Sequence, residues 1–168
     1  MSALSKRRLR AWVRLLGVTR QAEGALREFL RTRHGTTLPR FDVMAALHRR
    51  EAGVTMSELS RMLLVSNGNA TTVVDRLEAD GLVRRTSSEA DRRTVIVALT
   101  PAGLRLFEGL AVEHEREVDR LLAGLSEADL DLLTDLLKRM GRRDDHDGRM
   151  AGAALLVEPE RPHSHDPA

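Results

Sequence analysis

Residues 54–100 read V-T-M-S-E-L-S-R-M-L-L-V-S-N-G-N-A-T-T-V-V-D-R-L-E-A-D-G-L-V-R-R-T-S-S-E-A-D-R-R-T-V-I-V-A-L-T, and this stretch decides the fold. Near its start, Thr55 and Glu58 have the spacing of a capping box, in which each side chain accepts a hydrogen bond from the other residue's backbone N–H. The pattern predicts a short helix from Thr55 to about Leu64. Serine, asparagine and glycine at 66–68 favour turns and helix caps, so we expect this helix to be broken there.

A second helix is expected after the break, from Ser66 or Asn67 to Asp80, because Gly81 is the residue type that adopts the left-handed turn after a helix end. Its apolar residues share one side, namely Ala70, Val73, Val74 and Leu77. Its other side is small or polar, with Gly68, Asn69, Thr71, Thr72, Asp75 and Arg76. Such a thin helix suits the DNA major groove, where base edges offer donors, acceptors and thymine methyls. A solvated amphipathic helix without a ligand would give the same pattern.

Two short strands are expected next, over residues 82–86 and 94–99, and the second alternates in the manner of a half-buried strand. A polar loop with adjacent arginines near its end joins them. The order is therefore helix, turn, helix and then a hairpin that forms a wing. An arginine on the tip of such a wing can enter a narrow minor groove, where the negative potential is enhanced.

Several runs of this sequence resemble the MarR family of bacterial winged-helix transcription regulators. They are L-P-R-F-D-V-M-A-A-L, T-M-S-E-L-S, V-S-N-G-N-A-T-T-V-V-D-R-L-E-A-D-G-L-V-R-R and D-R-R-T-V-I-V-A-L-T-P-A-G. The match covers roughly residues 10–140, and D-R-R followed by L-T-P-x-G is its most specific part. The resemblance implies that Asp91 holds Arg93 in the wing and that Arg93 reaches the minor groove. It also implies that the first and last helices of two protomers interlock into a two-fold dimer.

Apolar periodicity predicts further helices over residues 4–33, 39–50 and 101–122, and a last one that Ser126 caps. The expected fold is mainly α with a small β-hairpin wing. We expect one domain over 1–140, in which 36–100 form the winged helix-turn-helix core and 4–33 and 101–140 are dimerisation helices. Residues 141–168 are polar and are expected to be a disordered tail. The flanking helices carry more apolar surface than a small core covers, so a homodimer is expected; the alternative is a monomer whose helices fold back.

Charge and composition narrow the class of protein. The chain of 168 residues has no cysteine, which excludes disulfides and thiol-based sensing of oxidants. The net charge is only +2, but residues 1–33 hold nine Lys or Arg against two Glu, a local charge of +7. A basic body favours a polyanionic partner, although a generally arginine-rich composition would explain it too. No apolar run is long enough for a membrane span and no secretory leader is recognisable, so we expect a cytoplasmic protein.

The residues expected to contact double-stranded DNA lie on the second helix and the wing. Recognition of a palindromic operator by two such helices in a dimer requires them to lie about one helical turn apart, roughly 34 Å. The predicted contacts are Ser66, Asn67, Asn69, Thr71, Thr72, Arg76, Asp91, Arg92 and Arg93. Arginines on the wing and on the first helix are expected to add affinity through phosphate contacts.

A small-molecule effector is the other expected partner, since MarR-like proteins commonly bind aromatic carboxylates between the dimer helices and the DNA-binding core. The residues predicted to line this crevice are Trp12, Arg14, Arg40, Met44 and His48, although plain core packing and solvated arginines would explain them equally well. The ligand is expected to be a small aromatic acid or its coenzyme A thioester. The sequence therefore predicts a repressor that the ligand releases, with a DNA-binding activator or an architectural protein that senses nothing as the alternative. A protein-interaction module that uses the winged fold without DNA is a third reading.

No catalytic pattern, cofactor motif or metal site is recognised in the sequence. It lacks a Gly-rich phosphate loop, H-E-x-x-H and G-x-S-x-G, so an enzyme is not expected. His163 and His165 near the C-terminus lack a second cluster of ligands, so no metal and no cofactor are predicted.

Overall fold

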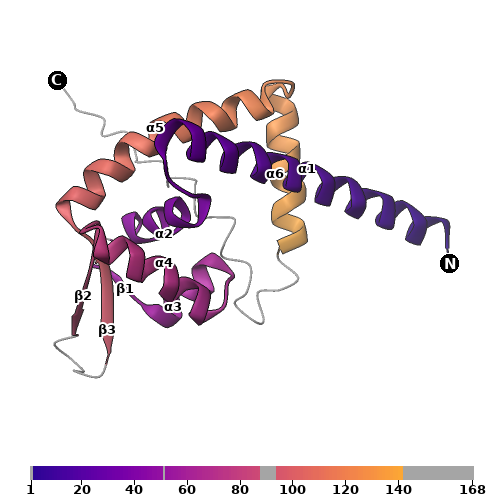
Figure 1. Ribbon diagram of the computed structural model, residues 1–168. Helices are drawn as coiled ribbons and strands as arrows, with labels where there is room; N and C mark the ends of the chain where they lie inside the picture. The colour runs from indigo at the N-terminus through magenta and orange to yellow at the C-terminus, as the bar shows by residue number, and fades with distance from the viewer. Residues whose placement is uncertain (1, 51, 88–93, 142–168) are drawn as a thin grey trace, which may run out of the picture.

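The computed structural model describes residues 2–50, 52–87 and 94–141. Figure 1 shows a small sheet at one edge of a mainly helical molecule, with its two longer strands extending downward side by side. The elements, in chain order, are α1 (Ala3–His34), α2 (Leu38–His48), β1 (Val54–Thr55), α3 (Met56–Leu63), α4 (Asn67–Ala79), β2 (Val83–Ser87), β3 (Val95–Leu99), α5 (Pro101–Leu122) and α6 (Glu127–Gly141). The mainly helical fold with a β wing, predicted from the sequence, is confirmed.

Helices α3 and α4 form the predicted helix-turn-helix. The capping box is present, because the Glu58 N–H donates to Thr55 Oγ1 at 3.2 Å and the Thr55 N–H donates to Glu58 Oε2 at 2.9 Å. Helix α3 ends where Leu64 takes a left-handed conformation with φ 54°, a rare state for a residue with a branched side chain. Ser66 then caps α4, and Gly81 follows that helix with φ 70°. Both helix ends agree with the prediction to within a residue.

The sheet has three strands, and the shortest of them was not predicted. Its order is β1-β3-β2 with both pairs antiparallel, and Val97 of β3 lies opposite Val54 of β1 and Arg85 of β2. Residues 54–55 were read only as the start of α3, since two residues are too few to show an alternating pattern. Gly53 precedes β1 with φ 78°, and a Cβ there would lie 2.6 Å from Ile96 Cγ2. The backbone before β1 therefore passes too close to β3 for a side chain.

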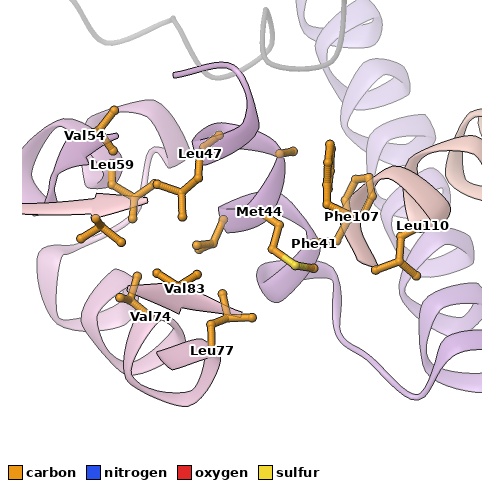
Figure 2. Close-up of a cluster of buried hydrophobic side chains, with 14 of the residues drawn as sticks. Phe41, Met44, Leu47, Val54, Leu59, Val74, Leu77, Val83, Phe107 and Leu110 are labelled. Carbon is orange, nitrogen blue, oxygen red and sulfur yellow. The ribbon is translucent and has the colours of Figure 1, made fainter. Parts of the chain in front are cut away.

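The hydrophobic core lies between α2 and the elements around it. Phe41, Met44 and Leu47 of α2 are fully buried, and α2 is apolar almost all round, as expected for a central helix. Figure 2 shows these three side chains meeting Val74 and Leu77 of α4 on one side and Phe107 and Leu110 of α5 on the other. The helix ends at His48, two residues before the predicted end, because the chain turns through hydrogen bonds such as that from the Arg50 N–H to the Leu47 carbonyl.

The start of α5 explains the L-T-P-x-G run. The Thr100 hydroxyl accepts from the Gly103 N–H at 3.0 Å and donates to the Gly81 carbonyl at 2.7 Å, so it caps α5 and ties it to the end of α4. A Cβ on Gly103 would lie 1.9 Å from the Leu82 carbonyl oxygen. Glycine is therefore required where α5 passes Leu82, the residue that precedes β2.

The flanking helices behave differently from the core. Helix α1 runs over 32 residues, of which Leu30 alone is buried, and its first half projects away from the rest of the chain (Figure 1). Helix α6 has no buried residue among those described. The large apolar side chains exposed on these two helices are Leu4, Leu9, Trp12, Val13, Val18, Leu132, Leu136, Leu137 and Met140. The tail predicted to be disordered lies outside the described residues from 142 onward.

Candidate nucleic-acid interface

The outer side of α4 presents the residues predicted to read DNA. Asn69, Thr72 and Arg76 are all exposed and follow one another at three and four residues, so they form one row along the helix, which we call the reading row. The Thr72 hydroxyl donates to the Gly68 carbonyl at 3.0 Å. Its proton is thereby used inside the helix, while the hydroxyl oxygen can still accept a hydrogen bond and the side chain remains exposed. The row thus offers an amide, a methyl with an acceptor, and a guanidinium.

The first turn of α4 is shaped by three of the other predicted contacts. The Ser66 hydroxyl accepts from the Asn69 N–H at 3.3 Å, which makes Ser66 the N-cap of α4. The Thr71 hydroxyl donates to the Asn67 carbonyl at 2.8 Å, and Thr71 is half-buried. Asn67 itself is exposed at the first position of the helix. These residues therefore set the helix start, and Asn67 and Ser66 remain accessible beside the reading row.

Two acidic residues of α4 are held by an arginine that the sequence prediction missed. Arg85 Nη2 lies 2.7 Å from Asp75 Oδ1, and Arg85 Nη1 lies 2.5 Å from Glu78 Oε2. Burial by itself would lower the pKa of Arg85, but the hydrogen bonds to Asp75 and Glu78 outweigh it, so the pKa is raised and the charge is secure. The available signal was a pair of acids three residues apart on a helix, followed by an arginine on the next strand.

A second ion pair joins α2 to the end of α4. Arg40 Nη2 lies 2.6 Å from Asp80 Oδ2, and the Arg40 side chain is only 21% exposed. Arg40 was predicted to line an effector crevice. In the single chain its guanidinium is instead engaged at the C-terminal end of the recognition helix.

The tip of the wing, with the predicted contacts Asp91, Arg92 and Arg93, lies outside the described residues. The two strands that lead to it are described, and Thr86, Ser87 and Val95 near their ends are exposed. Arg84 on β2 is exposed too, although the sequence prediction did not name it. In Figure 1, strands β2 and β3 run side by side away from the C-terminal end of α4.

The residues predicted to bind an effector are not brought together within one chain. Trp12 is 55% exposed on the projecting half of α1, and Arg14 shares a shallow hollow on that helix with Arg7 and Arg10. Met44 is completely buried in the core. His48 packs against Phe107, with ring centroids 4.8 Å apart. Two of the five predicted residues thus lie on α1 and three on α2, each in different surroundings.

A hollow of about 630 Å³ lies between the second half of α1 and α5. Its lining includes Phe29, Arg33, His34 and Glu117, and the buried His34 Nε2 finds no hydrogen-bond partner among the described residues. The lining carboxylates are mostly engaged, as in the pair between Glu117 and Arg120 at 2.7 Å. The hollow is large enough for a small organic molecule.

The seam between α1, α2 and α5 contains two titratable groups away from water. Burial, with a smaller contribution from the nearby Glu23 carboxylate, raises the pKa of Asp42 on α2 to about 6. Burial lowers the pKa of His114 on α5, whose ring stacks on Phe41 with centroids 4.3 Å apart. Folding therefore shifts both groups toward their neutral forms relative to the unfolded chain.

The described part of the chain contains neither a candidate membrane span nor a cluster of metal ligands. None of its helices combines the length and apolar character needed to cross a membrane. Over the same ranges, no three His, Asp or Glu side chains gather where they could hold a metal ion.

Comparison with known proteins agrees with this geometry. Residues 34–94 match the family model described as MarR family. The chain is 30% identical over 109 residues to the HTH-type transcriptional regulator MhqR of Bacillus subtilis, which covers 65% of this chain and 74% of MhqR. It is 34% identical over 118 residues to the transcriptional activatory protein BadR of Rhodopseudomonas palustris. The aligned region covers 66% of this chain and 67% of BadR. A mutant of MarR from E. coli complexed with operator DNA has the same fold, with a TM-score of 0.71, 26% identity and coverage of 83% and 99%.

Proposed function

We propose that this chain, which belongs to the MarR family and is a DNA-binding transcriptional regulator of that type, is a homodimeric repressor of a palindromic operator. In this proposal the protein works in the cytoplasm, and a small organic ligand releases it from the operator. The observation that carries the proposal is the reading row of α4, Asn69, Thr72 and Arg76, exposed beside the strands of the wing. A major groove accepts such a helix, and the adjacent wing can follow the DNA into the minor groove.

The dimer is supported by what the single chain leaves exposed. The apolar side chains of α1 and α6 include Trp12, at 55% exposure, and Met140, at 54%. Soluble proteins rarely leave a contiguous apolar surface of this kind without a partner. Residues 1–33 have a net charge of +7, whereas 101–140 hold nine acids and five bases, a net charge of −4. A second copy that packs its α1 against α5 and α6 therefore satisfies both the apolar surface and the charge.

The proposed effector is a small aromatic acid or its coenzyme A thioester. Trp12 and Arg14 on the projecting half of α1 are free to meet residues of another subunit, and His48 on α2 offers a ring beside Phe107. An arginine would bind the carboxylate of the ligand, and the aromatic side chains would pack against its ring. The ligand would act by preferring a dimer geometry in which the two recognition helices do not fit the operator.

The proposal is tested by titrating a fluorescent duplex of the DNA upstream of the gene, at fixed salt, with and without benzoate or 4-hydroxybenzoate. Arg76→Ala is expected to weaken binding by about 1–3 kcal/mol, the scale of one groove contact, and Arg93→Ala by a similar amount. The matched control is Arg116→Ala, an exposed arginine of α5 that is paired with Glu113 and is not among the predicted DNA contacts. Equal affinity of wild type and Arg76→Ala would contradict the assignment of the reading row.

The dimer has its own test. Leu136 on α6 and Val65 in the helix-turn-helix are both 41% exposed. In sedimentation equilibrium, Leu136→Ser is expected to raise the dimer dissociation constant about tenfold, since it removes apolar area from the interface. Val65→Ser should leave that constant unchanged. If both substitutions act alike, α6 does not form the interface.

A second candidate, an activator, has one specific observation in its favour. BadR, with 34% identity to this chain over 118 residues, is an activatory protein. The same DNA contacts serve either role, so the distinction lies in the position of the operator. A reporter fused to the target promoter separates the two roles, because deletion of the gene raises expression for a repressor and lowers it for an activator.

A further inference from the structure

One side chain of strand β2, Arg85, forms ion pairs with two acids of the recognition helix α4. Arg85 lies two residues after the buried Val83, so its side chain leaves β2 on the same side, toward α4. There its guanidinium bridges Asp75 and Glu78, with N–O distances of 2.7 Å and 2.5 Å. The two acids are three residues apart on α4 and so lie on one turn of the helix. The planar fork of an arginine suits two carboxylates in this arrangement.

The backbone of β2 takes part in the same connection. The Arg85 N–H donates to Glu78 Oε1 at 3.1 Å, while the other oxygen of that carboxylate accepts from the guanidinium. Glu78 therefore holds both the main chain and the side chain of one strand residue. A rotation of β2 away from α4 would break these contacts together.

The connection lies between the two elements that face DNA. Arg76 of the reading row directly follows Asp75 on α4. Ser87, the last residue of β2, leads into the wing loop. Both terminal nitrogens of the Arg85 guanidinium donate to carboxylates of α4. Arg85 thus connects the recognition helix to the strand that leads into the wing.

We propose that Arg85 is a positioning residue for operator binding, which keeps the wing at the angle to α4 that lets both enter their grooves. Asp75 and Glu78 are its counterparts on α4. This rests on the DNA-binding function proposed above and assigns a role to a residue that touches no DNA.

The test uses the sign of a charge effect. Asp75→Asn and Glu78→Gln each remove a negative charge close to the DNA, and electrostatics alone would tighten binding to a polyanion. If the acids act through Arg85, both variants instead weaken operator binding, by about three- to tenfold, and Arg85→Met weakens it by about tenfold or more. Glu108→Gln, which removes an exposed acid on α5, is the matched control and should leave the affinity unchanged.

A double-mutant cycle adds a second readout. Residues that share one contact show non-additive effects, so Arg85→Met combined with Glu78→Gln should bind no more weakly than Arg85→Met alone. Circular dichroism during thermal unfolding checks that each variant is folded, and the milder Asp75→Asn carries the test if Arg85→Met is not. Equal or tighter operator binding by both acid variants overturns the proposal. Failure of the wild-type protein to bind the duplex would instead refute the proposed function, and the same titration shows which has occurred.

Discussion

The DNA-reading core and the two flanking helices differ in where their apolar side chains go. In the core, Phe41, Leu59 and Leu77 are completely buried by other parts of the same chain. On the flanking helices, Trp12 and Leu136 remain 55% and 41% exposed. Burial of apolar surface is the main favourable term in folding, so the core is stabilised within one chain, whereas the first half of α1 and α6 need another surface. The same sequence thus contains one region that is complete within the chain and one, which we call unfinished, whose apolar side chains the proposed partner would cover.

Local signals nevertheless make α1 a helix. Ser2 caps its start, Gly35 closes its end with φ 60°, and Arg31, Arg33 and His34 lie in its last turn, where positive charge suits the helix dipole. Such terms contribute only fractions of a kcal/mol to about 1 kcal/mol each, and isolated helices are marginal in water. The ends of α1 are therefore encoded locally, but the stability of its projecting half is expected to come from packing in the dimer.

The largest expected effect is on the closest contact inside the complete region. Gly103→Ala places a Cβ 1.9 Å from the Leu82 carbonyl oxygen, a distance that requires the backbone of α5 or of the strand to move. We expect the free energy of unfolding to fall by at least about 3 kcal/mol, at the upper end for overpacked sites. Urea denaturation followed by circular dichroism measures this change.

Gly109→Ala is the matched control, because Gly109 lies on the same helix and a Cβ there would meet nothing within 4 Å in the chain. Alanine is more favourable than glycine in a helix interior, so this variant should be more stable by about 0.5–1 kcal/mol. A loss of stability at Gly109 as large as that at Gly103 would mean that helix α5, rather than its crossing of Leu82, is sensitive to substitution.

Much of this core was predictable from sequence because its boundaries depend on local chemistry. The capping box at Thr55, the cap at Ser66 and Gly81 after α4 each act within a few residues, so the pattern alone placed α3 and α4. Strand β1 was missed because its two residues are defined only by pairing with β3. The ion pairs of Arg85 were missed for the same reason, since they join β2 to α4. Arg85 is seven residues from Glu78 and ten residues from Asp75 in the chain.

The predicted effector residues show a different limit. On α2, residues 43–47 are all buried, so periodicity cannot separate two sides of the helix, and it left open whether Met44 lies in the core or lines a crevice. Arg40 finds Asp80 forty residues away. Trp12 is 55% exposed on the unfinished region, which the second chain of the proposed dimer would cover. The predicted effector residues are of types that suit an aromatic acid, but whether they lie together depends on tertiary and quaternary packing, which the sequence pattern does not show.

The next prediction concerns the seam where the two regions meet. Asp42 has a pKa of about 6 in the folded chain, against an ordinary value of 3.8, chiefly because burial disfavours its charged form. The folded state therefore holds this proton more tightly than the unfolded chain does, so the stabilisation is complete below about pH 4 and is lost as the pH rises through 6. At about 1.4 kcal/mol per pKa unit, Asp42→Asn should raise the stability at pH 8 by up to about 3 kcal/mol and change little at pH 4.

Urea denaturation of both proteins at pH 4 and pH 8 measures this difference. Asp119→Asn, at an exposed acid of α5, removes an equal charge without relieving burial, and it should alter the stability by no more than about 0.5 kcal/mol. If Asp42→Asn proves less stable than wild type at pH 8, the carboxylate must be stabilised in its charged form across the seam, contrary to the expected sign.

The smallest effects compare two helix caps, one in each region. Thr100 caps α5 by accepting from the Gly103 N–H at 3.0 Å, and it also donates to the Gly81 carbonyl of the core. Ser126 caps α6 by accepting from the Asp129 N–H at 3.3 Å, while the Asp129 carboxylate accepts from the Ser126 N–H at 3.0 Å. Thr100→Ala is expected to lower the unfolding free energy of the core by about 1–2 kcal/mol, since it removes both a cap and a second hydrogen bond.

Ser126→Ala removes a comparable cap, but on a helix that packs little against its own chain. We expect it to leave the unfolding of the core unchanged and to raise the dimer dissociation constant several-fold, because fraying of α6 weakens only the surface that the partner covers. Urea denaturation at two protein concentrations, together with sedimentation equilibrium, separates these outcomes. If Ser126→Ala lowers core stability at both concentrations as much as Thr100→Ala does, α6 is stabilised within the single chain and the division into a complete and an unfinished region is wrong.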